Sequence, residues 1–424
     1  MVKERYHKTR ETYKRLNIDT DAAISALSKI PVSMHCWQGD DVSGFEGKGA
    51  LSGGIAATGN YPGKARNYEE LMADIEKALS IIPGRHRLNL HANYAIFDKA
   101  PADRDALLPE HFSKWVTFAK KNNLGLDFNG TFFSHPKSEN ATLSSEDEKI
   151  RLFWIEHGKR CLKIAEYFAN ELGTHSLVDI WIPDGYKDTP ADRTAPRARL
   201  KNSLDQILAS DYDRDKVLVA VESKVFGIGM ESYTPGSHEF YMNYVAHKSA
   251  ADKSASMKNI LLLIDNGHYH PTENVADKIS SLLLFCDKVA LHVTRPVRWD
   301  SDHIVLYDDQ TREIVNEIIR CGADRVLIGL DYFDASVNRI AAWVIGMRNI
   351  QKALLYALLT PHAQFAKLQE ERRFTELLAL QEELKTYPAG DVWDYFCETN
   401  GVPVKEAWLE EVMRYEKDVL TKRV

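Results

Sequence analysis

Short apolar runs recur along the chain and are separated by stretches with a helical period. Eight runs rich in β-branched and aromatic residues occupy residues 30–38, 86–96, 124–133, 176–185, 216–226, 259–268, 288–299 and 325–334. Between them, residues 68–82 and 273–288 repeat apolar positions every three or four residues. In the second stretch Val275, Ile279 and Cys286 share one helical face. The pattern predicts eight strands that alternate with amphipathic helices.

This alternation favours an α/β fold, a (β/α)8 TIM barrel, because apolar parallel strands need helical crossovers and cover on both faces. A doubly wound open sheet is the alternative that the alternation alone allows. Polar or aromatic residues gather at the C-terminal ends of the runs: His35, Trp37, His91, Asn93, Asp127, Asn129, Trp181, Asp184, Glu222, Lys224, Asp265, His268, His292 and Asp331. A barrel keeps its active site at that end, so we favour the barrel.

Helical segments flank the predicted barrel. The first 29 residues indicate a helical cap, and residues 1–359 form the barrel with this cap. Residues 360–424 form a C-terminal helical extension, in which 363–387 and 407–423 are typical of exposed helices. We interpret the extension as a contact with a neighbouring subunit, although a solvated tail fits the pattern nearly as well. A Gly-rich loop at 51–67 is a candidate mobile lid.

Composition narrows the class of protein. The 424 residues are 44% hydrophobic and 27% charged, with a net charge of -7 and no polybasic run, which argues against a nucleic-acid partner. Five scattered cysteines without a CxxC pair indicate reduced thiols. The charged N-terminus lacks the apolar region of a secretory signal, and no run approaches the roughly 18 apolar residues of a membrane span. We expect a soluble cytoplasmic protein with no membrane partner.

The last four predicted strands carry a cluster of chemically active side chains. Its members are Glu222, Asp265, Asp300, Asp302 and Asp331, with His268, His292 and Lys224 beside them. Five carboxylates in one pocket repel one another. Two divalent ions would neutralise these five negative charges once the positive charge of the Lys224 ammonium is counted. Oxygen ligands with one imidazole per site suit Mn²⁺ or Mg²⁺. Asp300 and Asp302 tolerate each other if both bind one ion together with His268.

Each residue also has a purely structural interpretation. A single histidine on an apolar strand, such as His292, is more often a hydrogen-bonded core residue, and Asp331 and Asp265 suit a helix N-terminus and a turn. Trp37 and Trp181 could serve packing alone. Four successive strands that each end in a ligand-type residue favour the metal-site hypothesis. We expect no nucleotide cofactor, because the Gly-rich motifs lack the phosphate-binding spacing.

Several long and distinctive segments stand out in the sequence: MHCWQGDDVSGFE, LHANYA, VESKVFGIG, DNGHYHPTE, LHVTRPVRWDSDH, IGLDYFDAS and NRIAAWVIG. With these segments the chain resembles the L-rhamnose isomerase family over essentially its whole length. The resemblance implies a homotetramer that interconverts free L-rhamnose and L-rhamnulose with two Mn²⁺ ions per subunit, with Mg²⁺, Co²⁺ or Zn²⁺ as alternatives. It further implies a structural ion bound by Glu222, Asp265, His292 and Asp331, and a catalytic ion bound by His268, Asp300 and Asp302.

The implied reaction moves a hydrogen with its electrons from C2 to C1, so both sugar oxygens need positive charge nearby. We expect Lys224, Asp302, His91 and Trp181 to be catalytic, with the Lys224 ammonium near O1 and His91 assisting ring opening. Trp37 and Phe133 line the substrate pocket and, with Trp181, exclude water. The alternative is a related metal-dependent epimerase or isomerase acting on another free aldose.

Overall fold

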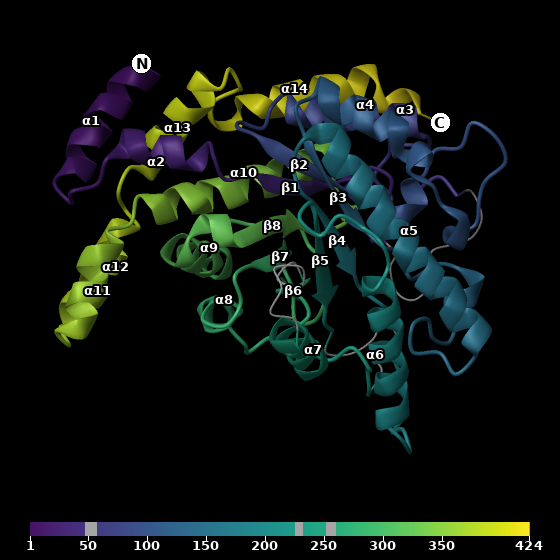
Figure 1. Cartoon of the computed structure of the whole chain (residues 1–424). Helices are drawn as coiled ribbons and strands as arrows, with labels where there is room; N and C mark the ends of the chain where they lie inside the picture. Colours follow the sequence, from purple (N-terminus) through teal and green to yellow (C-terminus); the bar gives the residue numbers. More distant parts are fainter. Residues whose placement is uncertain (47–56, 225–231, 252–259, 424) are drawn as a thin grey trace.

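The computed structural model describes residues 1–46, 57–224, 232–251 and 260–423. Eight parallel strands close into one barrel in chain order (Figure 1). They are β1 Val32–His35, β2 His86–His91, β3 Gly125–Asn129, β4 Ser176–Ile180, β5 Val217–Glu222, β6 Ile260–Asp265, β7 Val289–Val293 and β8 Val326–Leu330. The predicted barrel is confirmed, and the open sheet is wrong because β1 pairs with β8 through Val32 and Ile328.

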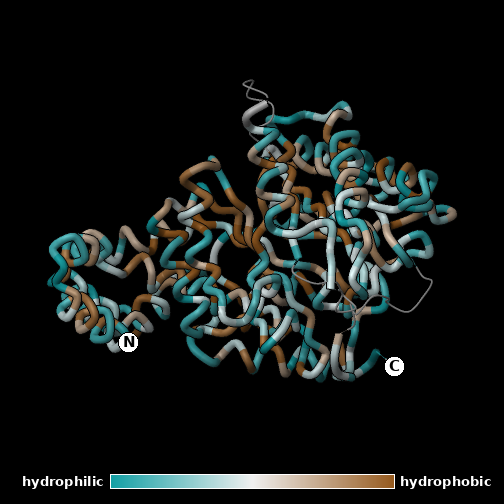
Figure 2. Tube along the Cα trace, turned by 90° about the horizontal axis from the view of Figure 1, so that it is seen from below, coloured by the Kyte–Doolittle hydropathy of each residue, from teal (hydrophilic) through white to brown (hydrophobic). Residues whose placement is uncertain are grey.

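Alternation along the strands gives the barrel two apolar layers. In β7, Val289, Leu291 and Val293 pack outward in the large core shared with the helices. The intervening Ala290 belongs to a smaller cluster of buried side chains from neighbouring strands. That inner cluster is formed by Leu177, Leu218, Ala220, Leu261, Leu263 and Ala290, with Leu327 packed against it. In Figure 2 the most hydrophobic stretches lie in the middle of the molecule, while hydrophilic segments predominate along its edge.

Helices follow the strands around the barrel. They are α3 Tyr68–Leu79, α4 Ser113–Lys121, α5 Glu148–Leu172, α6 Thr194–Leu208, α7 His238–Ala251, α8 Ala276–Leu283, α9 Asp309–Cys321 and α10 Arg339–Leu358. The helix predicted for 273–288 is shorter than expected. It ends at Leu283, and the next two residues, Leu284 and Phe285, are 80% and 87% exposed in a turn. Among the described residues, no helix is long and apolar enough to cross a membrane.

The two ends of the chain pack together. α1 Val2–Lys14 lies against α13 Ala389–Thr399, where Arg5 donates to Asp391 at 2.8 Å and to Asp394 at 2.6 Å. α2 Thr20–Leu27 completes the N-terminal cap, and α14 Trp408–Asp418 is tied to α3 because the Tyr415 hydroxyl donates to Asp74 at 2.9 Å. These helices of the extension are therefore held by their own barrel.

One predicted helix of the extension is divided in two. The segment 363–387 forms α11 His362–Glu370 and α12 Phe374–Leu384, because Arg372 adopts a left-handed conformation with φ of 57°. The backbone N–H of Arg373 then donates to the carbonyl of Leu368. The sequence has no Gly or Pro there to signal the break. The resulting pair of helices stands away from the barrel (Figure 1).

Candidate metal centre

The strands position the ligands by simple alternation. Asp179, Glu222, Asp265 and His292 each follow, by two positions, an apolar side chain of the inner cluster: Leu177, Ala220, Leu263 and Ala290. Because side chains two apart face the same side of a strand, these polar groups continue the inner column toward the C-terminal end. All four are buried. On each of these strands, the inward-facing position nearest the C-terminal end carries a candidate ligand, and the inward-facing position before it carries an apolar side chain.

Three overlapping groups of side chains have the spacing of a metal site. They are Asp179, Glu222 and His292; Glu222, Asp265 and His268; and Asp265, His292 and Asp331. Within each group the candidate ligand atoms lie within 4.8 Å of one another. Every group shares residues with the next, so the ligands form one continuous centre from β4 to the end of β8.

Two histidines lie between the carboxylates. His292 Nδ1 is 3.4 Å from Glu222 Oε1 and 3.5 Å from Asp331 Oδ2. His268 Nδ1 donates to the backbone carbonyl of Ser223 at 2.9 Å, which assigns the hydrogen to Nδ1 when the ring is neutral. His268 Nε2 is then an acceptor that faces Asp300 Oδ2 at 3.2 Å. Two acceptors at that distance require a proton or a cation between them.

Several of these buried atoms have no hydrogen-bond partner in the described part of the chain. They are Glu222 Oε1, Asp265 Oδ2, Asp300 Oδ1, His292 Nδ1 and both carboxylate oxygens of Asp179. Asp127 on β3 differs, since Arg87 and Ser33 donate to its carboxylate at 2.7 to 2.9 Å. An unpartnered buried acceptor is costly, and a bound cation removes that cost. The donor set therefore fits divalent metal ions.

The protonation behaviour agrees with an uncompensated centre. Burial and neighbouring carboxylates raise the pKa of Glu222 and of Asp302 well above the usual range, and burial also raises that of Asp331. Burial opposes ionisation of Asp300, but His268 keeps the Asp300 pKa below its usual value. Burial alone would lower the pKa of His268, but the charges of Asp300 and Asp265 raise this pKa well above its usual value. Without ions, the protein holds protons here in their place.

Asp300 and Asp302 reach the centre from the loop after β7. Asp302 has a left-handed backbone with φ of 42°, and its carbonyl accepts the N–H of Phe333 at 3.3 Å. The loop is closed at its base by Arg295 and His303, whose backbones pair. The charge of Asp300 is the largest contribution after burial to the raised pKa of Asp302. The structure therefore brings the seven residues expected as metal ligands to one end of the barrel, with Asp300 and Asp302 outside the three close groups.

A wall of rings borders the centre. Trp37 lies edge-on to His91 at 4.3 Å, His91 to Phe133 at 5.5 Å, and Phe133 to Trp181 at 5.7 Å, between ring centroids. Lys224 Nζ lies 5.4 Å from the Trp181 ring and donates to the carbonyl of Pro183. The expected pocket and catalytic residues thus lie together beside the ligands. The next residues, 225–231, lie outside the described part of the chain, as do 47–56, which include residues 51–56 of the candidate lid.

Trp37 does more than border the pocket. Its indole Nε1 donates to Asp331 Oδ1 at 2.9 Å, which leaves Oδ2 directed toward His292. A tryptophan just after β1 therefore orients a candidate ligand just after β8. Sequence reasoning assigned Trp37 to the pocket lining and had no signal for this hydrogen bond, because the two residues are far apart in the chain.

Thr131 fixes the tautomer of His91. The Thr131 hydroxyl accepts the backbone N–H of Ala92 at 2.8 Å and donates to the carbonyl of Asn129 at 3.1 Å. His91 Nδ1 lies 2.8 Å from the same oxygen and must be the donor, since the one hydroxyl hydrogen is already used. Burial lowers the pKa of His91 well below its usual range. The ring is therefore neutral, with Nε2 as its free acceptor.

Asp179 was missed by the sequence reasoning. It lies within the apolar run SLVDIWI and precedes the visible polar end of that run, so it was not considered with the strand-end residues. The alternation of inward and outward positions could have identified it, because Asp179 lies two residues after the inward Leu177.

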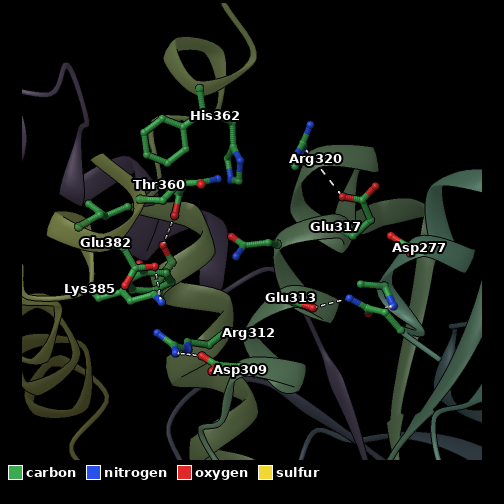
Figure 3. A pocket seen from close by; sticks show the side chains of 17 residues that line it. Asp277, Asp309, Arg312, Glu313, Glu317, Arg320, Thr360, His362, Glu382 and Lys385 are labelled. Carbon is green, nitrogen blue, oxygen red and sulfur yellow. Dashed lines mark hydrogen bonds and ion pairs between the residues drawn. The ribbon is translucent and has the colours of Figure 1, made fainter. Parts of the chain in front are cut away.

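A second pocket, of about 560 Å³, lies on the outside of the barrel between α8, α9 and the α11–α12 pair. Figure 3 shows that many of its charged groups are already paired, including Arg312 with Asp309 and Lys385 with Glu382. It contains none of the metal-type groups found in the described residues. The strand ends are therefore the stronger candidate for catalysis.

Known proteins resemble this chain along its full length. The family model of L-rhamnose isomerase (RhaA) matches residues 1–423. An L-rhamnose isomerase of Mannheimia succiniciproducens is 56% identical over 425 residues, which cover 100% of this chain and 99% of the relative. One of Listeria innocua is 53% identical with the same coverage. A solved L-ribulose 3-epimerase is a distant likeness, with a TM-score of 0.47 and 11% identity over 82% of this chain and 97% of that one.

The ion-free protein should lose stability as the pH rises. Burial, and then the charges of Asp300 and Asp331, raises the pKa of Asp265 from 3.8 to about 7. A carboxyl whose pKa is raised by folding stabilises the fold fully below its unfolded pKa, and this contribution is lost as the pH rises through the folded one. The Asp265 contribution therefore declines between pH 3.8 and about 7. Urea unfolding of chelator-treated protein across this range measures it.

The matched variant is Asp265→Asn, which removes the titrating group and retains its size. Its unfolding free energy should fall less steeply over the same pH range than that of the wild-type protein. Asp98→Asn, at an exposed carboxylate, should leave the slope unchanged. Equal slopes in wild type and Asp265→Asn would contradict the uncompensated charge at this position.

Proposed function

Because the chain belongs to the L-rhamnose isomerase family, we propose that it interconverts L-rhamnose and L-rhamnulose by a hydride shift between C2 and C1 at the strand-end site. The observation that carries this proposal is the buried group of unpartnered acceptors beside Lys224 and the ring wall. Isomerisation of a free aldose needs this combination, because negative charge develops on two neighbouring sugar oxygens during the hydride shift. The carbon skeleton must also be held away from water during that step.

Seven residues would hold two divalent ions. Glu222, Asp265, His292 and Asp331 would bind the structural ion, and His268, Asp300 and Asp302 the catalytic ion. The oxygen-rich ligands with one imidazole per ion favour Mn²⁺, and Mg²⁺, Co²⁺ and Zn²⁺ are the alternatives. The shared group of Glu222, Asp265 and His268 supports this arrangement, since it links the two ligand sets. When bound, the ions would stabilise negative charge on the sugar oxygens O1 and O2.

The chain's own residues prepare the sugar for this step. His91 Nε2, the free acceptor of a neutral ring, can accept the anomeric hydroxyl proton as the C1–O5 bond of the cyclic sugar breaks and return it to O5, because its lowered pKa does not let the ring keep the proton. The Lys224 ammonium adds fixed positive charge close enough to influence Asp300. Trp37, Phe133 and Trp181 supply apolar surface that orients the chain of the sugar and excludes water.

We further propose that the protein is a cytoplasmic homotetramer. Phe374 and Leu378 on α12 are one helical turn apart and are 58% and 61% exposed. They lie on the helix pair that stands away from its own barrel (Figure 1). Adjacent exposed apolar side chains on a projecting element suit a contact between subunits. The reduced cysteines expected from the sequence suit the cytoplasm.

The activity is tested with chelator-treated protein and L-rhamnose carrying deuterium at C2, in ordinary water. Adding Mn²⁺ should produce L-rhamnulose that keeps the label at C1, because the hydrogen moves within the sugar. The product is identified by NMR and mass spectrometry. Turnover with loss of label would contradict the hydride shift, and an epimer in place of a ketose would contradict isomerisation.

Lys224→Met should retain the fold and ion content and lower kcat about 10²- to 10³-fold, the usual cost of one charge-stabilising group. The matched control is Lys352→Met in α10. Lys352 also lies over a tryptophan, at 5.8 Å from the Trp393 ring, but far from the metal ligands in the fold. The control should retain wild-type kcat. A Lys224→Met enzyme with near wild-type kcat would rule out the polarising role.

Sedimentation equilibrium should give the mass of four 48.2 kDa chains. Phe374→Glu with Leu378→Glu should shift this mass toward smaller species, because charges replace apolar contact surface. Leu152→Glu on α5, across the barrel from α12, is the control and should leave the mass unchanged. A monomeric wild-type protein would refute the tetramer.

A further inference from the structure

Asp179 is a buried carboxylate for which the expected ion sites leave no role. It is 1% exposed, near the end of β4, and neither of its side-chain oxygens has a donor among the described residues. Its neighbour is the Glu222 carboxylate, with which it can form a hydrogen bond only by sharing a proton. Its own backbone carbonyl is satisfied, since it accepts the N–H of Gly130 at 3.0 Å. Only the side-chain oxygens of Asp179 therefore lack hydrogen-bond donors among the described residues.

Buried carboxylates away from the expected ion sites have donors. Asp184, five residues further along the chain, accepts two backbone N–H groups and two hydroxyls from Thr142 and Ser144 at 2.6 to 2.9 Å. Asp127 on β3 is paired with Arg87. Among the described residues, the other buried carboxylates with unpartnered oxygens are Glu222, Asp265 and Asp300, which are expected ion ligands, so Asp179 resembles the ligands in this respect.

The surroundings of Asp179 offer it only acceptors and a small neighbour. Asp179 and Glu222 carboxylate oxygens and a His292 ring nitrogen lie within 4.8 Å of one another, and Glu222 Oε1 and His292 Nδ1 are themselves unpartnered. In register, Asp179 lies beside Ala220 of β5, one inward step deeper than Glu222. Ala220 contributes only a methyl group at this level of the barrel.

We propose that Asp179 is an additional ligand of the structural ion, binding it from below together with Glu222 and His292. The proposal rests on the proposed function, because it assumes that the strand ends hold divalent ions. The structural ion would then draw ligands from five consecutive strand ends, β4 to β8. Four carboxylates around one divalent ion make its site strongly anionic, so this ion should bind more tightly than the catalytic one.

The experiment is a Mn²⁺ titration of full-length, chelator-treated protein, with free Mn²⁺ followed by electron paramagnetic resonance against a competing chelator. Wild type should show one tight and one weaker site. In Asp179→Asn the tight site should weaken about 10- to 100-fold or more, while the weaker site stays within about threefold. The control, Asp40→Asn, removes a buried carboxyl that accepts from Tyr94 and Gly44, and should change neither site.

The competing explanation is a proton shared between Asp179 and Glu222. Asn keeps the shape of a protonated aspartate and one donor group, so unchanged Mn²⁺ affinity in a folded Asp179→Asn variant would overturn the proposal alone. A wild-type protein that binds no Mn²⁺ would overturn the proposed function as well. Should the variant not fold, a wild-type crystal soaked in Mn²⁺ decides: an Asp179 oxygen coordinating the ion supports the proposal, and one out of reach overturns it.

Discussion

Negative charge buried at the C-terminal end of the barrel is the constraint on which the site depends. Parallel strands bring their carboxyl ends to one edge, and alternation turns Glu222, Asp265 and His292 inward above an apolar floor. The protein provides few donors there, and unpaired carboxylates in such a place cost several kcal/mol each unless protons or cations compensate them. Ion binding is therefore tied to the stability of the fold as well as to its chemistry.

The barrel satisfies some of its buried carboxylates and leaves others without donors. Asp127 on β3 is paired with Arg87 on β2. The carboxylates near the ends of β4, β5 and β6 have at least one oxygen without a partner in the described part of the chain, and they converge on one centre. Trp37, just after β1, donates to Asp331, just after β8, and so links the ring wall to this centre. The ring wall runs from Trp37 through His91 and Phe133 to Trp181, just after β4.

The sequence predicted the strand order and most of the centre because both follow from short-range patterns. Runs of apolar residues mark strands, and the polar residues after them must meet at one edge of a barrel. Asp179 was missed because it precedes the visible end of its run, although alternation places it inward. The break at Arg372 and the Trp37–Asp331 hydrogen bond were not predictable, since one lacks a Gly or Pro signal and the other joins residues 294 positions apart.

The central claim is that the buried carboxylates form a site for two divalent ions. Metal analysis tests it most directly, on chelator-treated protein dialysed against Mn²⁺ and then freed of excess ion on a desalting column. The account predicts two Mn²⁺ per chain, and fewer in a Glu222→Gln protein, whose side chain is common to two of the three ligand groups. Protein that retains no Mn²⁺, or a Glu222→Gln protein that retains as much as wild type, would contradict it.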